Sequence, residues 1–431
     1  MPAPLVGLAW SGGGLTGFFA SMCATVALRE LSAPGTMYSN SELPVAVNSG
    51  GTLGTILMAN APPGRLRFPP SWDPASYNYS SLSSRFQSGS DPEGSVWFAA
   101  IDNLVPSQHR QEADVYSRDN GSSWWLSALD VALGVYGLKQ PLHAGPQPLT
   151  AGVSLLRQSA TPIKRHPSSG VMLNAAGNLI PGEVDLNAGK LTAVGNGSAG
   201  FRPVADVGVL QGGSFSSAFW AAPIVELPSK LEFEAAKHAL ISAPGQPPSA
   251  GFWALDGGMV DTSGIAALLR RRVRSLVVFE NKNSDLTEIN STFAFLFGVD
   301  TPTDTQNSLE GPRLAQVFPR AAWPAEPSEN GLVNGSFHQL WRDLPVLANP
   351  YFGIPEPYVV ERLLIVSNQL STEFLDSFPL SSGIKAKLDD RWPNEFEVSM
   401  PPLDANALCV FSGWKVHKLA KLLREPFLTS R

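Results

Sequence analysis

The feature that most constrains the fold is a short apolar run near the N-terminus that ends in three consecutive glycines. Residues 5–10 read LVGLAW and residues 11–14 read SGGG, and a second apolar run at 45–48 leads into SGGT at 49–52. Segments of helical length follow both runs, at about 15–31 and 51–60. Buried strands that alternate with helices predict a parallel sheet covered by helices.

The same alternation returns later in the chain. We expect further strands at 206–211, 253–256 and 275–280 and a helix at about 262–273. Between 61 and 205 the pattern is irregular, apart from a helix predicted at 124–136 whose two tryptophans either pack in the core or contact a lipid surface. The sequence thus predicts one α/β domain with a largely parallel central sheet flanked by helices. Its core is expected at about 4–60 and 206–283, with a large irregular insertion at 61–205 and a C-terminal extension at 309–431.

The glycines after the first strand also have the spacing G-x-G-x-x-G, at Gly12, Gly14 and Gly17. A dinucleotide-binding loop needs, in addition, an acidic residue at the end of the second strand to bind the ribose hydroxyls. Asn48 occupies that place, so no NAD or FAD site is predicted and no cofactor is expected. The loop instead offers backbone N–H groups at a helix N-terminus, where negative charge is stabilised.

Ser49 lies between the second strand and its helix, as the serine of a nucleophile elbow does. The elbow usually has a glycine two residues earlier, where this chain has Val47. Asp256 ends another apolar run and precedes two glycines, so it is expected either to cap a helix or to lie beside Ser49 as its base.

An acyl-transfer site also needs donors for the oxyanion of the tetrahedral intermediate. The N–H groups of Gly12, Gly13 and Gly14 are the candidates, because parallel strands place their loops at the same edge of the sheet. These residues together predict nucleophilic attack on a carbonyl.

In order along the chain, SGGG at 11–14, SGGT at 49–52 and DGG at 256–258 resemble the motifs of the patatin-like and cytosolic phospholipase A2-type lipid acyl hydrolases. The segment 213–219, GSFSSAF, is a looser match. The resemblance implies a patatin-like fold and a Ser–Asp dyad without histidine, in which Ser49 attacks the ester and Asp256 accepts its proton. It implies a lipid acyl hydrolase of the phospholipase A or lysophospholipase type, with a lipid substrate at a membrane or micelle surface.

Two residues depart from the family pattern. Thr16 stands where the family usually has an arginine that is associated with the lipid phosphate, which favours neutral acylglycerols, galactolipids or lysolipids. Val47 replaces the first glycine of the elbow. Both departures motivate an alternative, a catalytically silent lipid-binding relative. A second alternative is a conventional Ser–Asp–His esterase that uses His338 or His417.

Composition sets the remaining expectations. A net charge of −6 argues against a nucleic-acid partner, and the histidine and cysteine spacings indicate no metal site. The first thirty residues lack the basic start of a signal peptide, and the chain has no apolar run of 18 residues. We therefore expect a cytoplasmic protein with possible peripheral membrane contact; the sequence does not indicate its oligomeric state.

Two smaller features concern cysteine and arginine. Cys23 and Cys409 are too few for a disulfide framework and favour a reducing compartment, against five Asn-x-Ser/Thr sequons that point weakly the other way. Cys23 is expected to pack unpaired on the first helix. The arginines in RRRVR at 270–274 are expected to form a solvated helix face, with contact to an anionic membrane as the alternative.

Overall fold

A computed structural model describes residues 6–32, 38, 43–60, 149–157, 164–165, 172–173, 179–194, 201–217, 252–281, 293–299, 316–323, 337–377, 382–390, 392–393, 400 and 402–428. Its strands are β1 (Val6–Trp10), β2 (Val45–Val47), β3 (Leu149–Arg157), β4 (Lys164–Arg165), β5 (Met172–Leu173), β6 (Leu179–Asp185), β7 (Lys190–Val194), β8 (Phe201–Asp206), β9 (Phe252–Asp256), β10 (Ser275–Phe279), β11 (His338–Val346) and β12 (Tyr358–Val366). Its helices are α1 (Gly14–Leu31), α2 (Ser49–Asn60), α7 (Val209–Ser216), α10 (Ile265–Arg270), α12 (Thr372–Asp376), α13 (Ser382–Asp390), α14 (Pro402–Lys418) and α15 (Ala420–Leu428), with 3-10 turns η5 (Gly257–Met259), η6 (Ala294–Phe297) and η8 (Arg320–Ala322).

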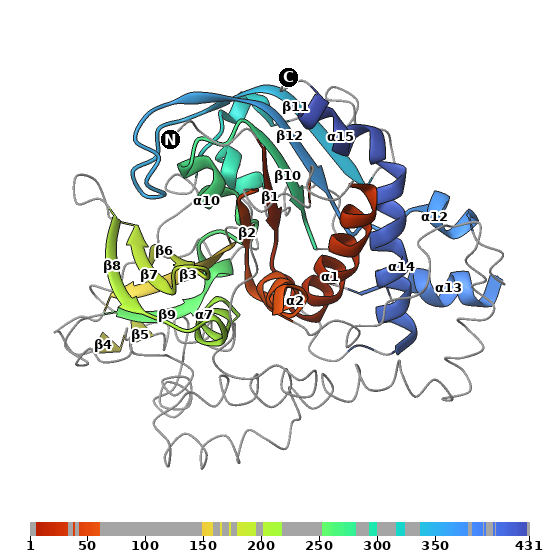
Figure 1. Ribbon diagram of the computed structural model, residues 1–431, viewed down its shortest axis with the longest axis horizontal. Coiled ribbons are helices and arrows are strands. Elements are labelled where there is room, and N and C mark those ends of the chain that lie inside the picture. Colours follow the sequence, from red (N-terminus) through yellow and green to blue (C-terminus); the bar gives the residue numbers. More distant parts are fainter. Residues whose placement is uncertain are drawn as a thin grey trace, which may run out of the picture.

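One sheet of ten strands organises the molecule (Figure 1). Its order is β11-β12-β10-β1-β2-β3-β6-β7-β8, and β9 pairs with β3 beside this path. The five strands β12, β10, β1, β2 and β3 are parallel to one another, while β11 at one edge and β6, β7 and β8 at the other pair antiparallel with the strands beside them. The predicted α/β class, with a central sheet that is largely parallel and flanked by helices, is confirmed.

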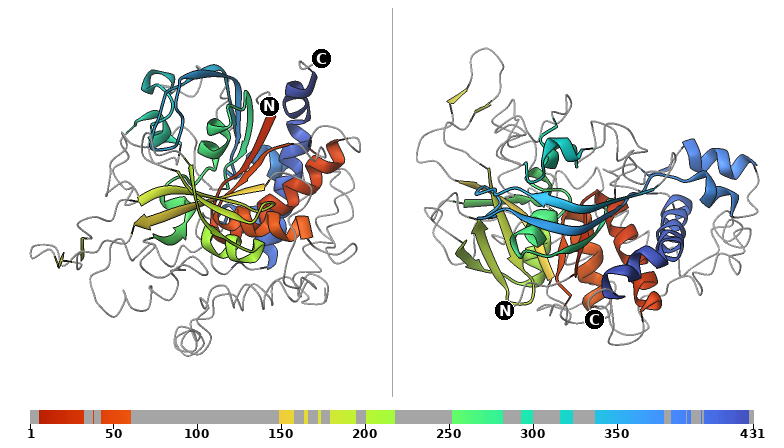
Figure 2. Two further views of the ribbon diagram at one scale, coloured as in Figure 1. Left: turned by 60° about the vertical axis from the view of Figure 1, so that its left-hand side comes forward. Right: turned by 90° about the horizontal axis from the view of Figure 1, so that it is seen from above.

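The central strands are apolar because both of their faces are covered (Figure 2). Successive side chains of a strand point to opposite faces, and along β1 Leu8 and Trp10 belong to one buried cluster while Ala9, between them, belongs to a second. The first cluster includes buried side chains of α1, α2 and α14, and the second includes those of α10 and η6. The sheet therefore separates two hydrophobic cores.

Two expectations about the later chain need correction. The strand predicted at 206–211 ends at Asp206, and α7 begins at Val209. The insertion is not irregular throughout, because β3, β6, β7 and β8 join the main sheet, and the C-terminal extension supplies β11 and β12. The antiparallel strands β6, β7 and β8 contain few consecutive apolar residues, so no buried run marks them in the sequence. The helix predicted at 124–136 lies outside the described residues.

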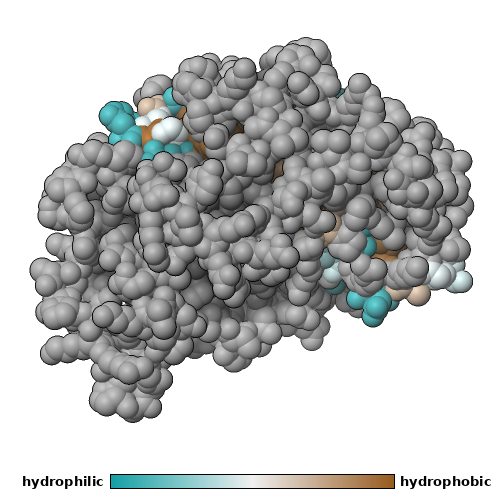
Figure 3. Space-filling model, turned by 90° about the horizontal axis from the view of Figure 1, so that it is seen from below, coloured by the Kyte–Doolittle hydropathy of each residue, from teal (hydrophilic) through white to brown (hydrophobic). Residues whose placement is uncertain are grey.

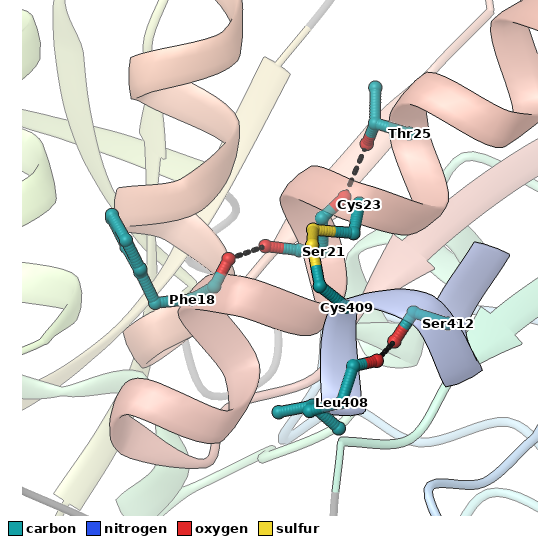
Figure 4. Close-up of a disulfide and its surroundings, with 7 residues drawn as sticks. All are labelled: Phe18, Ser21, Cys23, Thr25, Leu408, Cys409 and Ser412. Atoms are coloured by element: carbon teal, nitrogen blue, oxygen red, sulfur yellow. Dashed lines mark hydrogen bonds between the residues drawn. A yellow bond between two sulfur atoms is a disulfide. The ribbon is translucent and has the colours of Figure 1, made fainter. Parts of the chain in front are cut away.

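A disulfide joins Cys23 on α1 to Cys409 on α14, 386 positions apart (Figure 4). The two Cα atoms are 5.2 Å apart, an ordinary disulfide separation. Around it, the hydroxyls of Ser21 and Ser412 donate to carbonyls of their own helices. The prediction that Cys23 packs unpaired was wrong, and the cysteines no longer argue for a reducing compartment. A cytoplasmic location stays a prediction.

Reduction of this disulfide is expected to destabilise the fold without unfolding it at room temperature. A cross-link between distant residues restricts the unfolded chain, and its loss typically costs about 2–4 kcal/mol. Denaturant unfolding with and without a reductant measures the effect. A Cys23→Ala/Cys409→Ala double variant is the control, since its midpoint should not respond to reductant. Two free thiols in the oxidised, unfolded protein would contradict the expectation.

The arginines at 270–274 do not form a free basic surface. Arg270 and Arg271 both contact Glu183 of β6, which is buried. Arg272 and Arg274 pair with Glu356 and Glu361, respectively. The expected solvated face therefore holds for Arg272 and Arg274, whose side chains are 48% and 56% exposed, but not for Arg270, which is 5% exposed. All four cations have a carboxylate partner, which does not favour a contact with an anionic membrane.

The described surface also lacks an obvious membrane contact. Val359, at 48% exposure, is the one exposed large hydrophobic side chain among the described residues. Seen from below, the described residues reach the surface in two separate areas, and each area contains both hydrophobic and hydrophilic residues (Figure 3). No described helix is both long enough and apolar enough to cross a membrane.

Candidate active site

Ser49 and Asp256 meet because two strands run toward each other along the same edge of β3. β2 is parallel to β3 and its last residue, Val47, pairs with Ala151. β9 is antiparallel to β3 and its last residue, Asp256, pairs with Val153. Both strands therefore end at opposite sides of Gly152. The sequence predicted that the two residues lie together, but not that the strand of Asp256 runs in the opposite direction.

Ser49 has the backbone geometry of a nucleophile elbow. It is the first residue of α2, and its φ of 46° lies in the left-handed region that residues other than glycine rarely adopt. Its Oγ donates a hydrogen bond of 2.8 Å to Oδ2 of Asp256. Val47 in place of the usual glycine is fully buried in β2 and does not prevent this turn.

The glycine after Ser49 lets the elbow pack directly against the SGGG loop. A Cβ at Gly50 would lie 1.8 Å from the carbonyl oxygen of Gly14, a distance that no side chain tolerates. Gly51 is similarly close to the carbonyl oxygen of Ser11, with 2.6 Å for its added Cβ. Small residues are therefore required here because two backbone segments touch.

Asp256 is buried and accepts two hydrogen bonds. Oδ2 receives the Ser49 hydroxyl, and Oδ1 receives the N–H of Gly258 at 2.7 Å. The side chain thus caps η5 and contacts the serine at once, so the two positions expected from the sequence, a helix cap and a neighbour of Ser49, do not exclude each other. Burial away from water raises its pKa to about 7, although the hydrogen bonds from Gly258 and Ser49 oppose this change. A carboxyl group with a pKa near 7 suits a general base.

The SGGG loop supplies N–H groups beside the elbow, but not all three are free. The N–H of Gly12 donates to the carbonyl of Thr262 at 2.9 Å. Gly13 and Gly14 have positive φ values of 120° and 54°, and α1 begins at Gly14. Their N–H groups have no intrahelical acceptor, and no acceptor from the described part of the chain is recorded for them. The oxyanion site expected at Gly12, Gly13 and Gly14 therefore reduces to the last two.

Asn48 connects the elbow to the aspartate segment, a role that the sequence did not predict. Its Nδ2 donates to the carbonyls of Asp261 and Thr262, at 3.1 and 3.2 Å. The Thr262 carbonyl also accepts the N–H of Gly12, so it joins all three motifs. The sequence signal that could have indicated this role is Asn48 itself, a polar residue directly after an apolar strand, at the position where a dinucleotide-binding fold has an acidic residue.

The two histidines considered for a triad lie far from this pair. His338 begins β11, which is four strand positions from β2 in the sheet, or about 19 Å. His417 faces Glu30 near the far end of α1. Asp256 contacts Ser49 directly, with no imidazole between them. The geometry is that of a Ser–Asp pair.

Other polar groups near the site have structural partners. The carboxylate of Asp261 accepts from Ser263 and Ala266 and so caps α10. Thr16, at the position of the family arginine, is fully buried on α1. Among the described residues, no group of three His, Cys, Asp or Glu side chains is arranged to hold a metal ion.

Comparison with solved structures identifies the fold. Human GIVD cytosolic phospholipase A2 matches with a TM-score of 0.57 and 11% identity, over 99% of this chain and 62% of that one. The same enzyme in complex with methyl gamma-linolenyl fluorophosphonate and terbium chloride matches with a TM-score of 0.46 and 14% identity, over 99% of this chain and 59% of that one.

The first match shows a cytosolic phospholipase A2-like fold. This chain spans less than two thirds of the length of either matched chain. No protein-family model matches the sequence. No curated protein matches it either.

Proposed function

We propose that this protein is a lipid acyl hydrolase that cleaves carboxylic esters through a Ser49–Asp256 dyad. The observation that carries the proposal is the strained serine at a strand–helix turn, with its hydroxyl 2.8 Å from a buried carboxylate. A φ of this kind typically costs about 1–3 kcal/mol, persists only where the surrounding structure holds it, and is found most often at active sites. The likeness in fold to a phospholipase A2 supports the same conclusion.

The first half of the proposed reaction forms an acyl-enzyme. Oδ2 of Asp256 accepts the hydroxyl proton while Oγ of Ser49 bonds to the ester carbonyl carbon. The carbonyl oxygen becomes an oxyanion, which the N–H groups of Gly13 and Gly14 stabilise. When the tetrahedral intermediate collapses, the bond to the alcohol oxygen breaks and that oxygen takes the proton from Asp256.

The second half returns the enzyme to its starting state. A water molecule gives its proton to Asp256, and its oxygen bonds to the acyl carbon. Collapse of this second intermediate breaks the bond to Ser49 and releases the fatty acid. The proton then returns from Asp256 to Oγ of Ser49, so one ester and one water yield one acid and one alcohol.

The proposed substrates are neutral acylglycerols, galactolipids or lysolipids. Thr16 is buried and uncharged, so its position offers no cation to a lipid phosphate. In the RRRVR segment, Arg270 and Arg271 pair with Glu183. Acylglycerols, galactolipids and lysolipids presented at a membrane or micelle surface fit this arrangement better than diacyl phospholipids do.

A panel of lipid esters tests the proposal. Fatty-acid release is measured from micelles or vesicles of phosphatidylcholine, lysophosphatidylcholine, galactosyl diacylglycerol and diacylglycerol, with the native protein and with Ser49→Ala. Hydrolysis is expected for at least one neutral lipid or lysolipid, and Ser49→Ala should reduce it to background. Ser412→Ala is a matched control, because this buried serine on α14 bonds only the carbonyl of Leu408 in the described structure.

A fluorophosphonate probe separates the two main alternatives. Such a probe phosphonylates an activated serine, so mass spectrometry should locate it on Ser49. Folded protein that binds lipid but neither hydrolyses any ester nor reacts with the probe would be a catalytically silent relative, and the proposed function would be wrong.

A further inference from the structure

The backbone N–H of Ser49 needs an acceptor that its own segment does not supply. Ser49 is the first residue of α2, and the first N–H groups of a helix have no intrahelical partner. A side chain at the residue before a helix accepts from the second or third N–H of the helix, not from the first. Here that residue is Asn48; its Nδ2 donates to the carbonyls of Asp261 and Thr262, and its buried Oδ1 has no hydrogen-bond partner among the described residues. The acceptor for the N–H of Ser49 must therefore come from another part of the chain.

The cap comes from α7, 167 positions along the chain. Oγ of Ser216, the last residue of α7, accepts the N–H of Ser49 at 3.2 Å. The same hydroxyl lies 2.7 Å from Oγ1 of Thr52. Both Ser216 and Thr52 are fully buried, so water does not compete for these bonds. The hydroxyl of Ser216 thus hydrogen-bonds to both the first and the fourth residue of α2.

The hydrogen bond from the N–H of Ser49 to Ser216 acts on the residue whose φ is strained. A rotation of φ to negative values would relieve this strain, and it would turn the side chain of Ser49 relative to the peptide group that carries its N–H. The hydrogen bond from the N–H to Ser216 fixes that peptide group, and the hydrogen bond from Oγ to Asp256 fixes the side chain. Between them they hold the φ of 46°.

We propose that Ser216 is the positioning residue of the active site, whose hydroxyl holds Ser49 in the strained conformation that aims Oγ at Asp256. The role in catalysis rests on the proposed function above; the role in holding Ser49 does not. Ser216 itself does not contact the reacting atoms. It acts through the backbone of the nucleophile.

Loss of the hydroxyl should lower the rate of the chemical step more than it weakens substrate binding. In Ser216→Ala we expect kcat to fall about 10- to 100-fold, which corresponds to roughly 1.4–3 kcal/mol of transition-state stabilisation. KM should change little. The hydrogen bond from Ser49 lowers the pKa of Asp256, so its loss should move the acid limb of the pH–kcat profile to higher pH.

Two further variants separate positioning from a general packing effect. Ser216→Thr keeps the hydroxyl and should recover most of kcat and the native acid limb. Ser214→Ala removes another fully buried hydroxyl of α7, which among the described residues bonds only the carbonyl of Gln211, and should leave kcat and the acid limb unchanged. Equal loss in Ser214→Ala and Ser216→Ala, with no shift of the acid limb, would overturn the proposal.

A crystal structure of Ser216→Ala gives a readout that does not depend on activity. The expected result is a Ser49 φ that has left the positive region and an Oγ that has lost its bond to Asp256. If Ser49 keeps its positive φ and its 2.8 Å contact, the proposal is wrong even where the native protein is an active hydrolase. If the native protein proves inactive on every ester, the same structure still decides whether Ser216 holds Ser49.

Discussion

In Asp256→Asn, ester hydrolysis should be lost while the fold becomes more stable at pH 8. Both effects arise from the same buried carboxyl group, whose Oδ2 accepts the hydroxyl of Ser49. Asparagine has nearly the same shape and can keep the bond from Gly258 through its amide oxygen. It cannot accept a proton from Ser49. The expected loss of kcat is about 100- to 10 000-fold, the usual range for removal of a general base.

The pH dependence of the native enzyme should identify the same group. Burial raises the pKa of Asp256 to about 7, and only the ionised form can accept the serine proton. Activity should therefore fall as the pH is lowered through about 7. Ionisable lipids would confuse this measurement, so an uncharged acyl ester is the suitable substrate.

The stability effect has the opposite sign because the fold prefers the protonated carboxyl. Between the ordinary pKa of 3.8 and the raised value of about 7, the folded state binds more protons than the unfolded state. Stability therefore falls as the pH rises through this window. At pH 8 the ionised carboxylate costs the fold of the order of 4 kcal/mol, which asparagine avoids. At pH 4 the two proteins should differ little.

Denaturant unfolding at pH 4, 6 and 8, together with kcat, measures both effects. His338→Ala and His417→Ala are the controls for activity and should retain turnover, because neither side chain lies between Ser49 and Asp256. Lost turnover in either histidine variant with the fold intact would restore the triad. An Asp256→Asn protein that keeps native turnover would exclude Asp256 as the base.

The part of the site that the sequence predicts is the part encoded in short contiguous motifs. Ser49 and Asp256 each follow an apolar run and precede glycines, and such a pattern indicates a strand end at which a side chain is presented. The parallel centre of the sheet was predictable for a related reason, because strands buried on both faces are continuously apolar.

The residues that hold the motifs together could not be predicted, because their contacts join distant parts of the chain. The bond from Ser49 to Ser216 spans 167 positions, and the disulfide spans 386. Nothing local distinguishes Ser216 from Ser214 two residues earlier. The direction of β9 was hidden for the same reason, since a five-residue apolar run is equally compatible with either direction.

Substitution of Glu183 should cause a large loss of stability. Its carboxylate, on β6, accepts hydrogen bonds from the guanidinium groups of Arg270 and Arg271 on and just after α10. Arg271 also donates to Thr150 of β3. The carboxylate therefore ties the antiparallel edge of the sheet to the helix that follows the Asp256 segment.

Both sides of this ion pair are shielded from water, so removing one side leaves the other uncompensated. The side chains of Glu183 and Arg270 are 9% and 5% exposed. Breaking a buried pair by removing one partner typically costs about 3–5 kcal/mol, and we expect a loss in this range for Glu183→Ala. Glu361→Ala is the matched control. This substitution removes the partner of Arg274. The side chains of Arg274 and Glu361 are both more than half exposed, and such exposed pairs contribute about 0–1 kcal/mol.

The pH dependence distinguishes a lost ion pair from a lost packing contact. Burial by itself would raise the pKa of Glu183, but Arg270 and Arg271 outweigh it and hold the pKa at about 2, against an ordinary value of 4.5. The stability that this carboxylate contributes is thus complete above pH 4.5 and is lost as the pH falls toward 2. The difference in unfolding free energy between native protein and Glu183→Gln should be large at pH 7 and should shrink below pH 4. A difference that stays constant with pH would mean that Glu183 stabilises the fold by packing and not by its charge.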